Sequence, residues 1–213
     1  MLFRTAALLT GYCFGNISPG IIIAKIKGVD IKSEGSKNVG ATNVSRTVGI
    51  KMGVLTLILD CLKAIIPAIL VYLVLRNAQG HDVRYLCAYA SFGAVLGHVF
   101  PATQKFKGGK GIASSLGFLI IAEPLTALGC LLVFLITVII TRYVSLGSLI
   151  CTLVLPIQVL ALYYFNLLPY PKEVIPEVII LFVLDSLVCA FKHKDNIIRL
   201  IHGNENKFTF KKS

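Results

Sequence analysis

A glycine-rich basic segment at residues 107–111, KGGKG, stands directly before an apolar stretch that we expect to be helical. Consecutive glycines let backbone N–H groups turn toward one point, and the start of a helix adds unpaired N–H groups with a partial positive charge. These features predict a phosphate cradle made by Lys107, Gly108, Gly109 and Lys110. From spacing alone, a flexible interfacial loop explains the segment equally well. Gly111 rules out a Walker A motif, because Ser or Thr should follow that lysine.

A second polar segment, GSKNVGATNVSR at residues 35–46, lies between two apolar stretches. Its hydroxyl and amide side chains can hydrogen-bond a ligand, and they include Ser36, Asn38, Thr42 and Asn43. Arg46 can grip a phosphate or carboxylate with two parallel N–H groups. For any one of these residues a turn or a helix cap is the better interpretation. That interpretation is weaker for the whole set, which predicts one wall of a site.

The tail at residues 192–207, KHKDNIIRLIHGNENK, carries a third group of polar side chains. His193, Asn196 and Arg199 are three positions apart, so on a helix they line one face, and Glu205 follows them. An imidazole titrates near neutral pH and can accept a proton from an attacking hydroxyl. A lone histidine beside a membrane is more often only interfacial. His98, in GHVFP, can brace the glycine-rich segment.

Asp60 and Lys63 stand inside an apolar stretch. Each isolated charge costs about 2.5–3.5 kcal/mol near the centre of a bilayer, and residues three apart on a helix can pair. We therefore favour a structural ion pair over a proton path. The six cysteines form no C-x-x-C pair, and we expect no metal site and no disulfide framework.

These polar groups must be positioned by membrane-spanning helices. The chain is 56% hydrophobic with a mean hydropathy of +0.81, and several apolar runs reach the roughly 20 residues that cross a bilayer. We predict an all-α integral membrane protein with about seven transmembrane helices, forming one domain over residues 1–213. The fourth is short, because eleven residues reach only about 17 Å. The apolar segments are about 2–26, 54–75, 85–100, 112–122, 125–140, 144–168 and 174–191.

Charge sets the orientation of such a chain. With the N-terminus outside, sixteen lysines and arginines fall on inner segments and four on outer ones, as the positive-inside rule predicts. All three polar segments then lie on the cytoplasmic side, where they can converge on one site. The net charge of +11 does not indicate nucleic-acid binding, because the charges form no single basic domain.

Taken together, the three polar segments resemble the bacterial acyl-phosphate:glycerol-3-phosphate acyltransferase family. GSKNVGATNVSR is similar to the first motif of that family, GHVFPATQKFKGGKGIAS to the second and HKDNIIRLIHGNENK to the third. The resemblance extends in order from about residue 15 to residue 207 and includes RYVSLGS at residues 142–148. Lys37 departs from the pattern, since the family usually has glycine there. That departure puts the local loop geometry in question.

The resemblance implies an integral membrane enzyme that transfers a fatty acyl group from acyl phosphate to the sn-1 hydroxyl of glycerol 3-phosphate. The products are lysophosphatidic acid and phosphate, in the first committed step of phospholipid synthesis. His193, Asn196 and Ser36 would be the catalytic groups. The implied substrate-binding and phosphate-binding residues are Ser36, Asn38, Thr42, Arg46, Lys107, Gly108, Gly109, Lys110, Ser145 and Glu205.

No cofactor and no metal are implied, because acyl phosphate is already activated. The base that takes the hydroxyl proton stays open between His193 and a phosphate oxygen of the substrate. We expect a monomer in the bacterial cytoplasmic (inner) membrane with its site facing the cytoplasm. The alternative from another class is an organophosphate or phosphate transporter, although transporters usually hold their sites near the midplane. Catalytic product formation in detergent, without a gradient, discriminates the two.

Overall fold

The computed structural model describes residues 1–77 and 82–208 and contains only helices and loops over them. The predicted all-α class is confirmed. Lys211 and Lys212, counted above with the inner charges, lie outside the described residues. The elements are α1 (Leu2–Gly15), α2 (Pro19–Ile26), α3 (Ala41–Thr47), α4 (Ile50–Leu75), α5 (Arg84–Val99), η1 (Ala102–Gln104), α6 (Ile112–Ala122), α7 (Pro124–Thr141), α8 (Val144–Tyr164), α9 (Ile175–Lys192) and α10 (Lys194–Ile201).

The helices suit a bilayer in length and in surface. Within the described residues, five segments are long and apolar enough to cross a membrane: Leu2–Ile26, Ile50–Leu75, Arg84–Gln104, Pro124–Thr141 and Val144–Tyr164. Helix α6 is apolar but shorter, and α9 carries three charged residues along its 18 positions. Large apolar side chains cover the outside of the bundle, such as Ile139, which is 72% exposed, and Leu153, which is 70% exposed. The chain is therefore an integral membrane protein, while the count of seven crossings stays a prediction.

Two helix boundaries follow from proline. The expected first segment, 2–26, is two helices instead of one, because Ser18 is extended and Pro19 starts α2 at a position that tolerates a missing N–H. The expected break at residues 123–124 is present between α6 and α7. There the Glu123 carboxylate accepts a hydrogen bond from the Thr126 N–H at 2.7 Å and caps the helix that Pro124 begins.

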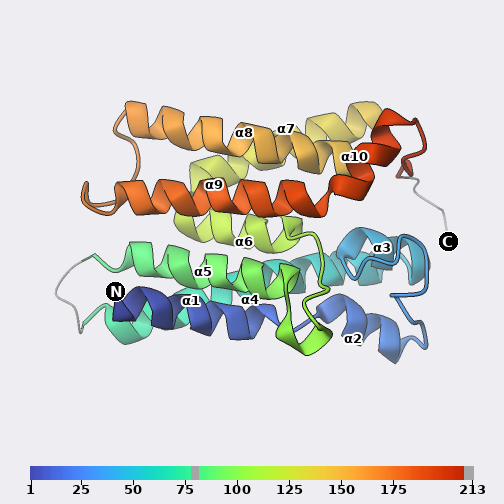
Figure 1. Ribbon diagram of the computed structural model, residues 1–213, viewed down its shortest axis with the longest axis horizontal. Helices are drawn as coiled ribbons and strands as arrows, with labels where there is room; N and C mark the ends of the chain where they lie inside the picture. Colours follow the sequence, from blue (N-terminus) through green and yellow to red (C-terminus); the bar gives the residue numbers. More distant parts are fainter. Residues whose placement is uncertain (78–81, 209–213) are drawn as a thin grey trace.

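Close helix packing uses small and aromatic residues. Helices α1 and α5 lie in contact, and a Cβ at Gly11 or Gly15 would overlap the backbone of α5. Between α5, α6 and α9, the rings of Phe92, Phe118 and Phe182 pack in sequence at centroid distances of 5.8 and 5.1 Å. This core holds α6 in the middle of the bundle (Figure 1).

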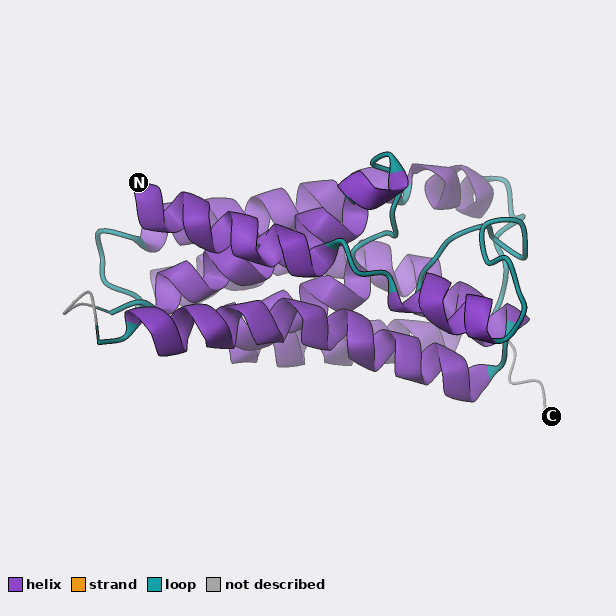
Figure 2. Ribbon diagram, turned by 90° about the horizontal axis from the view of Figure 1, so that it is seen from below, coloured by secondary structure: helices purple, strands orange, loops and turns teal. Residues whose placement is uncertain are grey.

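The three polar segments gather at one end of the bundle. The N-terminus and the loop between α8 and α9 lie at one end, whereas α3, α10 and the loop between α5 and α6 lie toward the other (Figure 1). In the view turned by 90°, the helices again run along the long axis, and the N-terminus lies at one end of the bundle (Figure 2). The alternating helix directions thus bring residues 35–46, 107–111 and 192–207 toward each other.

Candidate active site

A cavity of about 350 Å³ opens at the end of the bundle where the polar segments meet. Its mouth is polar, and its interior continues as an apolar groove between helices. The polar wall contains Ser36, Asn38, Thr42, Asn43, Arg46, Lys110, Ser145, Ser148, His193, Asn196, Arg199 and Glu205. The groove contains Leu57, Leu116, Leu119, Leu131, Phe134, Leu135 and Leu155. The cavity therefore suits a molecule with an anionic head and a long apolar chain.

The first polar segment is held in shape by Asn43, which is only 2% exposed. Its Nδ2 lies within hydrogen-bond distance of the carbonyl oxygens of Glu34 and Asn38, at 3.0 and 2.9 Å, and of Ile31, at 3.3 Å. Its Oδ1 accepts the N–H of Ser36 at 2.8 Å. One side chain thus fixes the loop before α3. Sequence reasoning singled out Asn43 only as one amide among several, because its partners depend on how the loop folds back.

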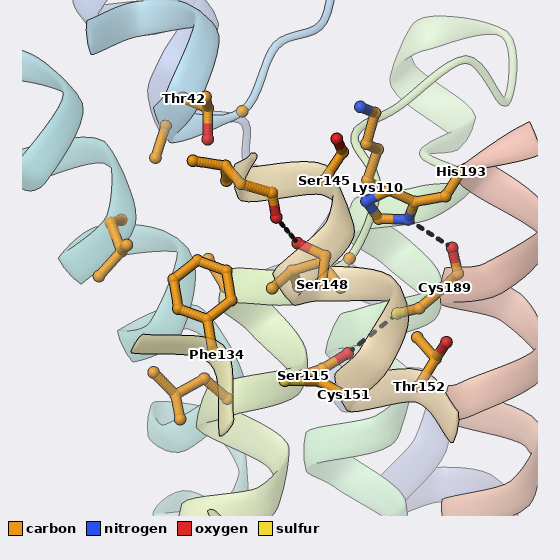
Figure 3. Close-up of a pocket in the computed structure, with 18 of the residues that line it drawn as sticks. Thr42, Lys110, Ser115, Phe134, Ser145, Ser148, Cys151, Thr152, Cys189 and His193 are labelled. Atoms are coloured by element: carbon orange, nitrogen blue, oxygen red, sulfur yellow. Dashed lines mark hydrogen bonds between the residues drawn. The ribbon is translucent and has the colours of Figure 1, made fainter. Parts of the chain in front are cut away.

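The other residues of this segment lie around the mouth. Asn38 Oδ1 accepts the N–H of Gly40 at 2.9 Å, so this side chain also shapes the turn. Ser36 and Arg46 are exposed, and the Arg46 guanidinium donates to the carbonyl oxygen of Asn206 in the tail at 3.3 Å. Thr42 points toward the cavity from α3 (Figure 3). Four residues expected from the first segment therefore line the cavity.

Lys37 has a left-handed backbone conformation, with φ of +58°. Glycine adopts this conformation without a steric penalty, whereas other residues lose roughly 1–2 kcal/mol there. The departure from glycine at residue 37 therefore has a conformational cost. The loop keeps a conformation that glycine prefers, and Lys37 itself is exposed and does not line the cavity.

The glycine-rich segment differs from the expected cradle. The N–H of Gly109 donates to the carbonyl oxygen of His98 at 3.0 Å, and the N–H of Gly108 donates to that of Val99 at 3.3 Å. These two donors are consequently used by the end of α5 instead of pointing at a shared anion. Lys107 is exposed, and neither it nor the two glycines line the cavity. Of the four residues expected in the cradle, the structure brings Lys110 into the wall.

Lys110 stands at the start of α6 and faces the polar wall of the cavity (Figure 3). The pKa of its ammonium is lowered to about 8, mainly by burial. The Arg199 and Arg46 guanidinium groups act in the same direction, and the Glu205 carboxylate opposes them. The ammonium is still charged at neutral pH. Because it is charged and partly buried, the ammonium is stabilised when an anion binds next to it.

His193 lies between α9 and α10 and is buried at the cavity wall. Its Nδ1 is 2.7 Å from the carbonyl oxygen of Cys189. Because a carbonyl oxygen can only accept, Nδ1 carries the ring proton and Nε2 keeps its lone pair. Burial lowers the pKa of His193 to about 4, and the nearby Lys110 charge acts in the same direction. The ring is neutral at pH 7 and can accept a hydrogen bond.

The third segment forms the predicted helical face. His193, Asn196 and Arg199 all line the cavity. The Glu205 Oε2 accepts from Asn196 Nδ2 at 3.1 Å and from Arg199 Nε at 3.0 Å, so the tail folds back onto α10. Asn196 Oδ1 is buried and has no hydrogen-bond partner among the described residues. Arg199 adds a cation to the wall that the predicted set of site residues did not include.

Ser145, at the start of α8, adds a hydroxyl to the polar wall. It is buried, its Oγ has no hydrogen-bond partner within the described part of the chain, and it lines the same cavity as Lys110 (Figure 3). One turn later, Ser148 Oγ donates to the carbonyl oxygen of Val144 at 3.0 Å. Ser145 therefore offers a free hydroxyl to a ligand.

The charges of the wall indicate an anionic ligand. Three cations, Arg46, Lys110 and Arg199, line the cavity together with three carboxylates. Each carboxylate already has a partner: Glu205 accepts from Asn196 and Arg199, Asp60 pairs with Lys63, and Asp185 accepts from Ser115. Over residues 1–77 and 82–208, no group of three His, Cys, Asp or Glu side chains could hold a metal ion. The predicted pair between Asp60 and Lys63 is present in α4, with an Nζ–Oδ1 distance of 2.8 Å.

Comparison with known proteins gives one consistent result. A family model described as glycerol-3-phosphate acyltransferase matches residues 5–203. Relatives named glycerol-3-phosphate acyltransferase include one from Trichlorobacter lovleyi, 41% identical over 92% of this chain and 93% of its own length. Another, from Aquifex aeolicus, is 39% identical over 94% of this chain and 97% of its own length.

A solved structure agrees with these sequence matches. It is the crystal structure of PlsY (YgiH), an integral membrane glycerol 3-phosphate acyltransferase, in its glycerol 3-phosphate form, and it superimposes with a TM-score of 0.80 at 35% identity. The match covers 97% of this chain and 96% of that chain. A lysophosphatidic acid form of the same protein matches with a TM-score of 0.78. The chain described here belongs to the glycerol-3-phosphate acyltransferase family.

Proposed function

We propose that this protein transfers a fatty acyl group from acyl phosphate to the sn-1 hydroxyl of glycerol 3-phosphate, releasing lysophosphatidic acid and inorganic phosphate. The observation that carries the proposal is the form of the cavity. A cluster of cations at its mouth, Arg46, Lys110 and Arg199, continues into a groove of leucines and Phe134. Both substrates carry phosphate, and one of them also carries a long apolar chain.

Phosphate is held mainly by fixed positive charge in this proposal. Lys110 and Arg46 approach from two different segments of the chain, and the first turn of α6 adds unpaired N–H groups beside Lys110. The hydroxyl and amide groups of Ser36, Asn38 and Thr42 surround the same mouth. Charge-assisted hydrogen bonds of this kind are about twice as strong as neutral ones.

The reaction needs positioning more than activation. The hydroxyl oxygen of glycerol 3-phosphate attacks the carbonyl carbon of acyl phosphate, the new C–O bond forms, and the bond to the phosphate oxygen breaks. Phosphate leaves with the bonding electrons. Ser145 and Ser36 supply hydroxyl donors for the carbonyl oxygen as it gains negative charge, and the unpaired Asn196 Oδ1 can accept from the attacking hydroxyl.

The proton of the attacking hydroxyl has two possible acceptors. His193 Nε2 keeps a lone pair and lies at the cavity wall, which supports a role in orienting or deprotonating the hydroxyl. Its pKa of about 4 makes it a weak base, so a phosphate oxygen of the substrate competes for the proton. We propose His193, Asn196 and Ser36 as the catalytic group, and the kinetics of His193→Ala discriminate between the two proton acceptors.

We further propose that the enzyme is a single transmembrane domain that acts as a monomer in the bacterial inner membrane. The cytoplasmic orientation of the mouth rests on the distribution of lysine and arginine. The activated donor supports a reaction without metal or cofactor.

The decisive experiment incubates the purified protein in detergent with acyl phosphate and glycerol 3-phosphate and measures phosphate release and lysophosphatidic acid. Stoichiometric formation of both products is expected, with and without a metal chelator. Acyl-CoA serves as the control donor and should give little product. Absence of product without a gradient, together with substrate uptake in vesicles, would favour the transporter alternative.

A further inference from the structure

A buried polar network lies directly beneath the glycine-rich loop. It joins Asp60 and Lys63 of α4 to His98 of α5, whose exposed fractions are 1%, 5% and 6%. Lys63 Nζ is 2.8 Å from Asp60 Oδ1 and 2.6 Å from His98 Nδ1. Lys63 Nζ also donates to the carbonyl oxygen of Ile17 at 2.9 Å, at the break between α1 and α2. The ammonium thus has one ion-pair partner and two hydrogen-bond partners.

The Lys63 ammonium also decides the state of the His98 ring. An ammonium can only donate, so His98 Nδ1 is the acceptor and the ring proton lies on Nε2. The ring is held on one edge by Lys63, and the same ring nitrogen lies 3.3 Å from Asp60 Oδ1. Neither the orientation nor the tautomer of His98 is free to change without breaking one of these bonds.

His98 is in turn the surface on which the glycine-rich loop lies. Its carbonyl oxygen accepts the N–H of Gly109 at 3.0 Å. A Cβ at Gly109 would overlap the His98 ring at Nε2, and a Cβ at Gly108 would overlap the His98 carbonyl oxygen. The two glycines therefore follow the shape of this histidine, and Lys110 is the next residue in the chain.

Packing alone does not account for the network. Two charges inside a membrane-spanning helix are costly, and replacing a buried ion pair by apolar residues of similar size is often neutral or stabilising. Asp60 and His98 also reach the wall of the cavity. A role in the site explains why charged groups stand at positions where apolar side chains would make the fold as stable or more stable.

We propose that Asp60, Lys63 and His98 are positioning residues that hold the glycine-rich loop, and through it the Lys110 ammonium, at the phosphate end of the cavity. Lys63 fixes the orientation of the His98 ring. The ring and the backbone carbonyl of His98 then fix Gly108 and Gly109, and these glycines place Lys110 next to a substrate phosphate. This inference rests on the proposed acyl transfer. It adds three residues that act on binding by holding the loop.

The test removes both charges at once, with the variant Asp60→Leu/Lys63→Met. No unpaired buried charge remains, so the variant is expected to fold. Its KM for at least one of the two phosphate substrates should rise about tenfold or more while kcat changes less, because the loop loses its template. Wild-type KM values for both substrates in the folded double variant would overturn the proposal.

A second comparison shows whether the network acts through Lys110. Combined with Lys110→Ala, the double variant should add little to the loss that Lys110→Ala causes alone, because the positioned group is already missing. If the effects of the two sets of substitutions on KM multiply, the network does not act through Lys110 and the proposal is overturned. The matched control is Arg4→Met/Glu177→Leu, which removes an ion pair of 2.7 Å at the opposite end of the bundle and should leave both KM values unchanged.

If the double variant does not fold, His98→Asn decides. The shorter amide can still accept from Lys63 but no longer fills the space against Gly109, so KM should rise in a protein of near-normal stability. An unchanged KM in this variant would overturn the proposal. Failure of the acyl-transfer proposal is distinct from either result, because then the wild-type protein would itself form no product.

Discussion

Lys110 offers the sharpest test of the site, because its charge is expected to destabilise the empty protein and to stabilise the complex. A pKa of about 8 instead of 10.5 means that partial burial disfavours the ammonium by at most about 3 kcal/mol when no anion is bound. A phosphate that binds beside Lys110 gives the ammonium a negatively charged partner. Losing that contact costs about 1.5–3 kcal/mol, which is roughly a 10- to 150-fold change in substrate efficiency.

The change is Lys110→Met, which keeps an unbranched side chain and removes the charge. We expect thermal unfolding in detergent, without substrate, to show a more stable protein at pH 7. We expect kcat/KM to fall by about 10- to 150-fold in the same variant. Opposite signs for stability and activity are the signature of a charge held in place for a ligand.

Lys107→Met is the matched control. Lys107 is exposed, does not line the cavity and stands three positions away, so stability and kcat/KM should both stay near those of the wild type. A loss of activity in Lys107→Met comparable to that in Lys110→Met would refute the reasoning. So would a Lys110→Met variant that keeps full activity.

The same group predicts a pH dependence with a definite sign. Between pH 8 and 10.5 the unfolded chain binds the Lys110 proton more tightly than the folded one, so this group makes the empty protein more stable as the pH rises through that window. Substrate binding should change in the opposite direction, because the cation is lost above about pH 8. Both trends should be absent from Lys110→Met, and their persistence there would assign them to another group.

Four further predictions concern separate parts of the site. Arg46→Ala should lower kcat/KM by about 10- to 150-fold, and Arg46→Lys should recover only part of it, because lysine cannot form the two-pronged contact; a silent Arg46→Ala would make residues 35–46 a linker. His193→Ala should mainly lower kcat at saturating substrate, and an intact kcat in this variant would favour the substrate phosphate as the base. The wild-type kcat should show no His193 titration between pH 5 and 8, because this ring is already neutral there. Asn43→Leu should disorder the loop before α3, which raises KM and the rate of protease cleavage near Ser33. Asn43→Ser should raise both by a smaller amount, and equal KM values in the two variants would contradict the loop-organising role. A single cysteine at Ser33, in an otherwise cysteine-free protein, should resist impermeant thiol reagents in intact cells, and labelling from outside would reverse the proposed orientation.

Sequence by itself determined the features that depend on local composition. Apolar runs of bilayer length define the helices, because a helix satisfies its own backbone hydrogen bonds inside lipid and needs about 20 residues to cross it. The alternation of these runs, together with the lysine and arginine distribution, predicts that the three polar segments meet at one end, and they do. The Asp60–Lys63 pair was equally predictable, since its partners are one helical turn apart.

Tertiary structure decided which members of each polar segment reach the cavity. Lys107 and Lys110 look equivalent in the sequence, but only Lys110 faces the wall, because His98 and Val99 at the end of α5 take the N–H groups of the glycines between them. The break at Pro19 lets Ile17 meet Lys63, which is 46 positions away.

The role of each polar group depends on its distant partners. Arg46 meets the Asn206 carbonyl 160 positions along the chain, and Lys63 meets His98 35 positions along. Hydrogen bonds act over about 3 Å and hydropathy acts along a whole helix. Local pattern can therefore predict where helices form and which end of the bundle is polar, but only the packing of distant segments selects the donors and acceptors that face the substrate.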